Sequence, residues 1–536
     1  MSGFEVVGLL LALPPIIQEL CTLGKVVCDL VKDRPFATKE INALVDLIDT
    51  KQKAYFETID LIQKSGKLTE KQAAMIIVRL EWIKENYIVA QVVLGKWMTN
   101  DKPGKLRFID AAKIIVAREE KSVTEKLKQL DHSFTQLGTD VTLFLHAAGI
   151  KLTPEEMATV QRADIPADLK LAKRMMMNKR MEEEGNLVQE LSADDIGSNV
   201  TFEELGDGFA LGKNTTRLFS NCIFNHRVIP ALNRVKTLME DTQRIATLLH
   251  DPLAYGVPGA ERNARKPDIG DNGLLPCMGF VKILGKTADQ CRYDLILKLP
   301  PSTCLHPPPR SLRSLLASAR EEGPMHPLSQ RVEFAIKLCR AVLLVHSADI
   351  IHKAIRPESI VVVESSVLPT NREFPKGLGR PYLLGFGMAR KTGDSERKTF
   401  KYEPLNKLVY HHPRHQHPER NEDYHMLDDI YSLGVMLMEI GIWCSMFRWH
   451  ENTTNPERSE WLVDNEVVRM TVGGGPYDDR YAPEEIHDKF IALADTDVRS
   501  MMGNKYADVV LTCLRSWEWT FEDGEDGNDG TTKSPI

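Results

Sequence analysis

PYLLGFGMAR, residues 381–390, is an apolar run that ends in Gly385-Phe386-Gly387 and then reaches Arg390. A short apolar run bounded by proline and glycine predicts a strand, and the glycines with the basic residue predict a turn into a loop. A Gly-Phe-Gly triplet alone carries little information. Its meaning depends on the segments that accompany it along the chain.

Three segments accompany it in a fixed order. Residues 329–352 have the apolar spacing of a long helix, and that helix is followed by IIHKAIRPESIVV, residues 350–362. Downstream of the triplet, DDIYSLGVMLMEIG is apolar on nearly every side, as a fully buried helix must be. We expect that helix to span roughly residues 428–441.

These segments resemble the protein kinase family. His352 matches the first residue of its H-R-D-L-x-x-x-N catalytic loop, Phe386 and Gly387 match its Asp-Phe-Gly, and Asp429 matches the start of its central helix. The resemblance implies an α+β bilobal fold over residues 200–521, with His352 and Phe386 in or near contact.

The residues that carry kinase chemistry are missing from the same motifs. Ala354 stands in place of the catalytic Asp, Ser359 in place of the metal-binding Asn, and Gly385 in place of the magnesium-binding Asp. Positioning and charge neutralisation are nearly the whole of phosphoryl transfer, and loss of a general base alone typically forfeits ~10²–10⁴ in rate. The resemblance therefore implies a pseudokinase rather than an enzyme, with no magnesium site. An active kinase with unorthodox residues is the remote alternative.

The preceding segment, from about residue 200, has the short strand-like runs of a small lobe. The runs are NVTFEEL, RLFSNCIF, PCMGFVKIL and YDLILKL, with one helix predicted over residues 234–252. Gly206 and Gly208 form only part of a phosphate-binding glycine loop, and a hairpin turn is the alternative. We expect the third strand around HRVIPAL, residues 226–232, where no lysine is in register. ATP binding is therefore doubtful, and no cofactor is predicted.

Residues 1–150 predict an all-α four-helix bundle. Apolar residues recur at helical spacing, for example Ile41, Leu44, Val45 and Ile48, and again Ala74, Ile77, Val78, Leu80 and Ile83. Residues 151–199 are expected to be a helical connector, and residues 522–536, acidic and rich in glycine, a disordered tail.

Residues 6–24 form the most apolar stretch, with Glu19 as its only charge. Its apolar core is shorter than the ~20 residues of a spanning helix, and Pro14 and Pro15 interrupt helix hydrogen bonding unless they begin a helix. A buried core helix is one interpretation. A helix that leaves the core and enters a bilayer conditionally is the other, and its membrane-active residues would be Val6, Leu10, Leu13, Ile17 and Glu19.

Two clusters in the kinase-like half have ordinary explanations. The stretch YHHPRHQHPER holds His411, His412, His415 and His417, for which we expect a docking or structural role; no metal site is predicted, because no carboxylate or cysteine partner is evident. The loop before it carries hydroxyls among basic residues, and another kinase could phosphorylate them. These candidates are Thr392, Ser395, Thr399 and Tyr402.

The bulk composition narrows the setting. The net charge of −7 argues against a nucleic-acid partner, and the 9 cysteines show no metal-binding spacing, which suits a reducing compartment. No basic secretory signal opens the sequence. These features predict a cytoplasmic protein at rest.

The order of bundle, connector and kinase-like half resembles two groups. These are the mixed-lineage-kinase-domain-like executioners of necroptosis and, more closely, fungal HeLo-type (prion-inhibition and propagation) proteins with a C-terminal kinase-like domain. The resemblance implies a regulator whose bundle permeabilises membranes in regulated cell death, with lipid, protein partners and self-oligomerisation on activation. A soluble signalling scaffold that binds protein partners is the alternative.

Overall fold

The computed structural model divides the chain into two compact units, which are residues 1–191 with 242–280, and residues 192–241 with 281–536. The residues that it describes are 3–32, 38–66, 68–99, 109–147, 178, 181–206, 208–228, 235–250, 273–283, 292–300, 303–305, 308–318, 326–364, 377–392, 405–416, 423–448, 457–458 and 483–516.

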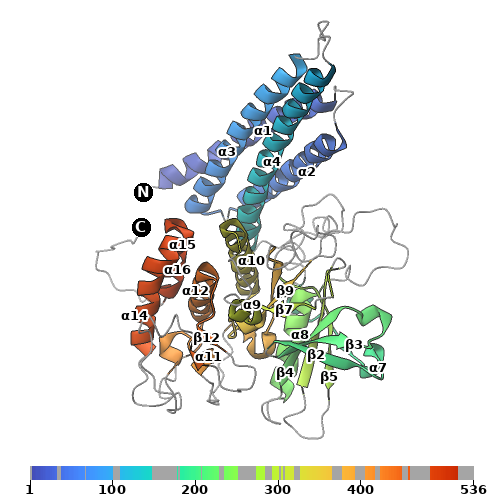
Figure 1. Ribbon diagram of the computed structural model, residues 1–536, viewed down its shortest axis with the longest axis vertical. Coiled ribbons are helices and arrows are strands. Elements are labelled where there is room, and N and C mark those ends of the chain that lie inside the picture. The colour runs from blue at the N-terminus through green and yellow to red at the C-terminus, as the bar shows by residue number, and fades with distance from the viewer. Residues whose placement is uncertain are drawn as a thin grey trace. The chain divides into compact units, whose positions relative to one another are not determined.

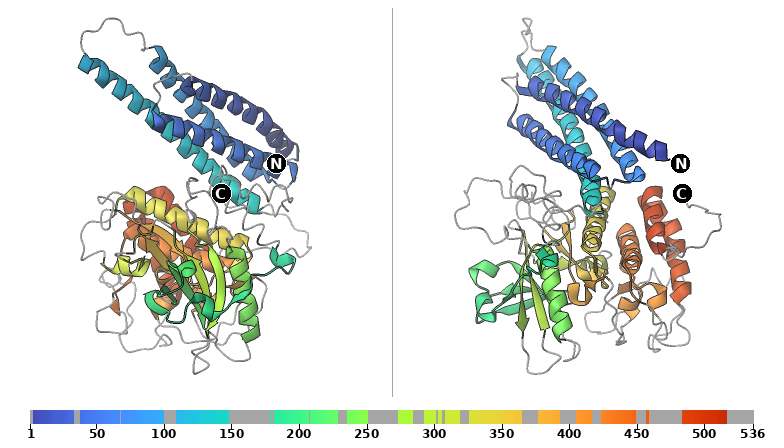
Figure 2. Two further views of the ribbon diagram at one scale, coloured as in Figure 1. Left: turned by 90° about the vertical axis from the view of Figure 1, so that its right-hand side faces the viewer. Right: turned by 180° about the vertical axis from the view of Figure 1, so that it is seen from behind.

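Four long helices form most of the first unit and lie side by side (Figures 1 and 2). They are α1 (Gly3–Lys32), α2 (Lys39–Lys64), α3 (Glu70–Thr99) and α4 (Ile109–Ala147). Helix α2 begins where it does because the Thr38 side chain accepts a hydrogen bond from the backbone N–H of Ile41. The predicted four-helix region is confirmed.

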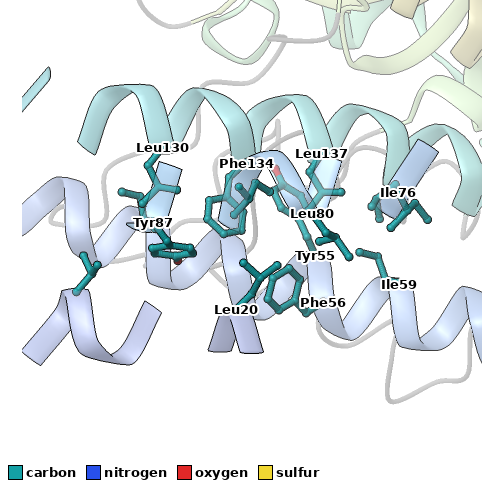
Figure 3. Packing of buried hydrophobic residues seen from close by; sticks show 14 of the residues in the cluster. Leu20, Tyr55, Phe56, Ile59, Ile76, Leu80, Tyr87, Leu130, Phe134 and Leu137 are labelled. Carbon is teal, nitrogen blue, oxygen red and sulfur yellow. The ribbon is translucent and has the colours of Figure 1, made fainter. Parts of the chain in front are cut away.

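The bundle core is continuous and almost wholly apolar. Its centre is the ring of Phe134, which lies 5.9 Å from the ring of Tyr87 and 6.1 Å from that of Phe56, with Leu20 and Leu80 close by (Figure 3). Inter-helix polar contacts lie mainly nearer the rim, including Lys51–Asp131, Arg79–Asp140, Lys84–Glu19 and Lys128–Glu40. Apolar burial thus dominates the stability of this unit.

The N-terminal helix corrects one expectation. Helix α1 runs unbroken through Pro14 and Pro15, both of which face solvent, so the prolines do not mark a helix end. Its fully buried residues Leu13, Leu20 and Val27 repeat at a spacing that keeps one face against the core. Among the described residues, no helix combines the length and apolarity needed to cross a membrane.

The third helix corrects a second expectation. Val78, expected on the core face, is 67% exposed. The buried residues of α3 are Ala73, Ile76, Leu80, Ile83, Tyr87, Ala90 and Leu94. The sequence of α3 is apolar on two sides, so the spacing of apolar residues did not distinguish the inner face from the outer one.

The later part of the chain contains a mixed α+β region. Six strands are hydrogen-bonded in the order β1-β5-β6-β4-β3-β2. Their bounds are β1 (Glu190–Leu191), β2 (Thr201–Gly206), β3 (Phe209–Lys213), β4 (Cys222–Val228), β5 (Cys277–Ile283) and β6 (Arg292–Lys298). Strand β1 and the short helix α7 (Ala193–Ile196) fall within the range expected to be connector, and α8 (Val235–Leu249) is the helix expected after the third strand.

Strand β4 differs from the expected strand around HRVIPAL. It begins earlier, at Cys222, and ends at Val228, and residues 229–234 lie outside the described residues. A 3-10 turn, η2 (Arg217–Phe219), and Asn221 with a φ of +58° separate it from the residues before it. The turn buries Phe219, and the chain after it returns as β4, which pairs antiparallel with β3.

Helices dominate the rest of the second unit, with short strands between them. The main elements are α9 (Leu312–Ser318), α10 (Leu328–Ser347), β9 (Ile360–Val363), β10 (Arg380–Leu383), α12 (Met426–Ile442), α14 (Pro483–Leu493) and α16 (Asn504–Leu514). Helix α12 is buried almost throughout, lies beside α16 (Figure 1), and closely matches the deep helix expected over 428–441. Its N-terminus is fixed by Asp428, whose carboxylate accepts a hydrogen bond from the backbone N–H of the N-cap residue His425 at 2.6 Å.

Candidate functional site

The candidate site is the turn after β10, where the Gly385-Phe386-Gly387 triplet meets strand β4. Gly385 adopts a left-handed conformation with φ of +80°. The backbone N–H groups of Gly385 and Phe386 both donate to Oδ1 of Asn225, at 2.8 and 3.0 Å. Asn225 is fully buried on β4, so one side-chain oxygen holds the turn in place.

Ser359 closes the space next to Gly385. A Cβ atom built on Gly385 would lie 2.6 Å from the Ser359 Oγ atom, which is closer than any side chain tolerates. Ser359 is itself buried, in the 3-10 turn η6 (Pro357–Ser359). Two of the three positions that differ from the kinase pattern, Ser359 and Gly385, therefore face each other, and a carboxylate does not fit at 385 without movement of the 357–359 turn.

A second buried residue of β4 clamps the same segment. Arg227 is 1% exposed, and its guanidinium donates to the backbone oxygen of Phe386 and, at 2.9 Å, to that of Ala389. Its charge is directed at carbonyl groups of the turn. The sequence pattern did not predict a role for Asn225 or Arg227, although three consecutive polar residues in the strand CIFNHRV, Asn225 to Arg227, were a usable signal.

His352 and Phe386 are in contact, as predicted. Their ring centroids lie 4.9 Å apart. His352 Nε2 lies 2.8 Å from the Leu384 carbonyl oxygen, which can only accept, so Nε2 carries the proton, and Nδ1 accepts from the Ala354 backbone N–H. Burial lowers the pKa of His352 to about 4, so the ring is neutral and structural.

Asp429 ties this turn to the deep helix α12. Its two carboxylate oxygens accept from the backbone N–H groups of His352 and Lys353 at 2.7 and 2.9 Å, and from the Tyr424 hydroxyl at 3.2 Å. His346 Nε2 lies 3.0 Å from the same carboxylate. Asp429 is fully buried, and both of its carboxylate oxygens are engaged by these partners. Its role is therefore structural.

The partial glycine loop is a tight hairpin against the 357–359 turn. A Cβ on Gly206 would lie 2.3 Å from the Phe209 ring and 2.8 Å from the Glu358 carbonyl oxygen. Gly208 has a φ of +82°, and its carbonyl accepts from the His226 backbone N–H at 2.7 Å. The fully buried Phe209 thus fills the space beneath the hairpin.

Two acidic side chains near the site are neutralised by an arginine of the same chain. Arg313 of α9 donates to Glu358 at 2.8 Å and to Glu439 of α12 at 3.0 Å, and it also donates to Ser445 at 2.7 Å. Tyr410 donates its hydroxyl to Glu439 at 2.7 Å. Burial raises the pKa of Glu439 in spite of Arg313. Neither carboxylate is therefore open to a basic group from outside.

The histidine cluster has a structural role in the described residues. His415 Nε2 lies 3.0 Å from Asp428, Arg414 donates to the same carboxylate, and the His415 ring stacks on Tyr424. Burial acts to raise the pKa of Asp428, but hydrogen bonds from His415 and Arg414 outweigh it and lower that pKa. Within the described part of the chain no group of three His, Cys, Asp or Glu side chains is placed to hold a metal ion. His417 lies outside it.

The remaining candidates do not join this site. The Thr392 hydroxyl donates to the Asp349 carbonyl oxygen at 3.0 Å, whereas Ser395, Thr399 and Tyr402 lie outside the described residues. In α1, Leu13 is buried and Ile17 is half-buried, and the side chains of Val6 and Leu10 are not described. Glu19 is 49% exposed and pairs with Lys84 at 2.8 Å.

Comparison with known protein families gives no matching family, and comparison with functionally described proteins gives no significant match. What the site can do chemically therefore follows from its own side chains. The side chains that contact the 385–386 turn offer an amide, a hydroxyl, a guanidinium and a neutral imidazole. Both nitrogens of the imidazole are hydrogen-bonded to backbone, so it is not free to act as a general base, and none of the four groups is a hard anionic metal ligand.

Proposed function

We propose that the chain is a catalytically inactive, kinase-like regulator joined to a helical bundle that permeabilises membranes conditionally. The setting would be regulated cell death or incompatibility signalling of the fungal type. The protein would be cytoplasmic at rest and would reach lipid, protein partners and further copies of itself on activation.

The inactive, kinase-like part of the proposal rests on one observation. Gly385 lies against Ser359, and its backbone N–H is hydrogen-bonded to Asn225. The contacts that hold the turn are retained, namely His352 against Phe386 and Asp429 on the backbone of His352. The groups that would act on a phosphate are replaced by groups that fill space or bind backbone. The sheet order and the buried helix α12 support a kinase-like architecture further.

Nucleotide binding is disfavoured by the same geometry. Phe209 lies under the hairpin that would cover phosphates, and Asn225 is held by the 385–386 turn. We expect no phosphotransfer with magnesium-ATP and no rise in melting temperature with ATP, with or without magnesium. Turnover that persists through purification and is lost on mutation of a pocket acid would refute this part.

The membrane part is supported by the character of α1. Its most apolar stretch has one carboxylate, Glu19, held at the rim by Lys84. An acidic side chain in the middle of a bilayer costs ~2.5–3.5 kcal/mol on insertion scales, which is large enough to prevent spontaneous insertion and small enough for assembly to offset.

Liposome leakage tests this part directly. Glu19→Leu should raise leakage by residues 1–150, and Leu10→Asp should abolish it, in each case relative to the unmodified bundle. Melting curves of both variants provide the control. If Glu19→Leu leaves leakage unchanged and Leu10→Asp only lowers the melting temperature, the membrane function fails.

A signalling scaffold is the second candidate, and a specific observation favours it. Leu13 and Leu20 of α1 are fully buried in the bundle core, so release of the helix would expose them. Under the scaffold hypothesis α1 never leaves the core, and lipid vesicles do not change its protection from hydrogen exchange.

A further inference from the structure

Helix α3 has a second apolar line on the side opposite its core face. We call it the outer stripe; its members are Lys71, Met75, Val78, Trp82, Glu85, Val89, Val92 and Lys96. All are exposed, and Val78, Val92 and Met75 are 67%, 52% and 47% exposed. Their spacing alternates between three and four residues, as does that of the core residues of α3. That spacing is typical of packing against another helix.

The outer stripe is symmetric along its length. About the peptide bond between Ile83 and Lys84, Met75 mirrors Val92, Val78 mirrors Val89, and Trp82 mirrors Glu85. A lysine closes each end. A line with this symmetry complements a copy of itself that runs in the opposite direction, which is the condition for a two-fold interface.

We propose that a second copy of this chain packs on the outer stripe, with the two α3 helices antiparallel. Val78 then faces Val89 of the second copy, Met75 faces Val92 of the second copy, and the indole N–H of Trp82 can donate to the carboxylate of Glu85 of the second copy. A parallel pair would instead place Glu85 against Glu85, and facing like charges are unfavourable.

The charges along α3 favour this partner over lipid. Glu81 and Glu85 are both exposed on the same side, and Glu85 interrupts the centre of the outer stripe. A helix that lies on a bilayer has a wide apolar face flanked by basic residues. The outer stripe carries acid in its middle, which suits a helix partner with a matching indole.

This inference deepens the proposed function, since it assigns the surface through which copies associate. It differs in one respect, because the pair forms weakly in the resting chain, before activation, and it rests on the proposed function only for what the pair then does. The association itself is measured in solution without vesicles. A dimer that causes no leakage would refute the membrane function and leave the interface intact.

Sedimentation of the full chain is the first test. We expect a dimer that dissociates on dilution, and at least tenfold weaker association for Val78→Glu and for Val89→Lys. The variant with both substitutions should regain association, because the carboxylate introduced at position 78 would face the ammonium group introduced at position 89 of the second copy. The matched control is Leu47→Glu on α2, where the residue is 42% exposed, and it should leave the mass unchanged.

Cysteine cross-linking tests the direction and does not depend on destabilising the interface. In a Cys21→Ser background, Val78→Cys with Val89→Cys should form disulfide-linked dimers. Within one chain the two positions lie about 16 Å apart along the helix, too far for a disulfide. Each single variant should fail to cross-link through α3.

Several outcomes would overturn the proposal. These are a monomer at every concentration, the same loss of association for Leu47→Glu, or cross-linking by the single variants, which indicates a parallel pair. Vesicle binding that falls in Val78→Glu while the mass stays that of a monomer would assign the outer stripe to lipid instead.

Discussion

The bundle and the turn around Gly385 are held together in different ways. In the bundle the core is apolar, and inter-helix ion pairs such as Lys84–Glu19 lie at a half-exposed rim. Around Gly385 the stabilising groups are buried and polar, with Asn225, Arg227 and Asp429 each bound to backbone from distant parts of the chain.

The difference bears on which region can change conformation. Apolar packing is non-directional, so helices can exchange one apolar partner for another at moderate cost. A buried hydrogen-bond network tolerates no such exchange, because each unpaired group costs about 1–3 kcal/mol. We therefore expect the bundle to be the region that rearranges and the region around Gly385 to be the rigid one.

The largest effect should come from Arg313→Met. It leaves Glu358 and Glu439 buried beside each other without their cation, and we expect a loss of about 3–5 kcal/mol in the unfolding free energy of the second unit. Chemical denaturation followed by tryptophan fluorescence measures it. Arg499→Met, whose partners Asp495 and Asp508 are exposed, is the control and should change little. Equal effects would contradict the view that burial makes the network costly to break.

Acid should destabilise the second unit through His352. Its folded-state pKa of about 4 lies below the value near 6.5 of an unfolded chain, so between these values the unfolded state binds more protons. Stability is therefore full above pH 6.5 and falls as the pH drops toward 4, by an amount on the order of 3 kcal/mol from this residue.

Unfolding titrations at a series of pH values test the assignment. Burial also lowers the pKa values of His326 and His412, to about 4 and about 3, so the wild-type slope has several contributors. His352→Gln should reduce the slope without abolishing it. If the slope is unchanged in this variant, His352 already binds protons in the folded state, and burial does not lower its pKa.

Gly385→Ala should cost less, about 2 kcal/mol, because it forces an alanine into the left-handed region and against Ser359. Gly385→Asp should cost at least as much and should restore no phosphotransfer. Adding Ser359→Gly should recover part of the alanine cost, since it removes the contact and leaves the backbone strain. Recovery of all of it would mean that the conformation of residue 385 is not strained.

The smallest effect should come from Lys84→Gln, which removes the rim partner of Glu19. Because both side chains are solvated, the melting temperature of the bundle should barely change, and salt should reduce the difference further. A large drop would place this pair among the determinants of bundle stability and would weaken the contrast between the two regions.

Local periodicity determined much of the fold from the sequence alone. Four bundle helices, the strand after residue 380 and the buried helix at 426–442 follow from spacing and breakers, which are properties of neighbouring residues. The contact of His352 with Phe386 followed from the order of motifs. The same periodicity wrongly predicts Val78 of α3 on the core face, because α3 is apolar on two sides.

Only the tertiary structure decided which groups meet across long separations. Asn225 and Gly385 are 160 residues apart, and Arg313 and Glu439 are 126 residues apart. No local pattern encodes such pairs, since they depend on how strands and helices pack. The outer stripe of α3 is of the same kind: its residues can be read from the sequence, but their exposure depends on which face the other three helices bury.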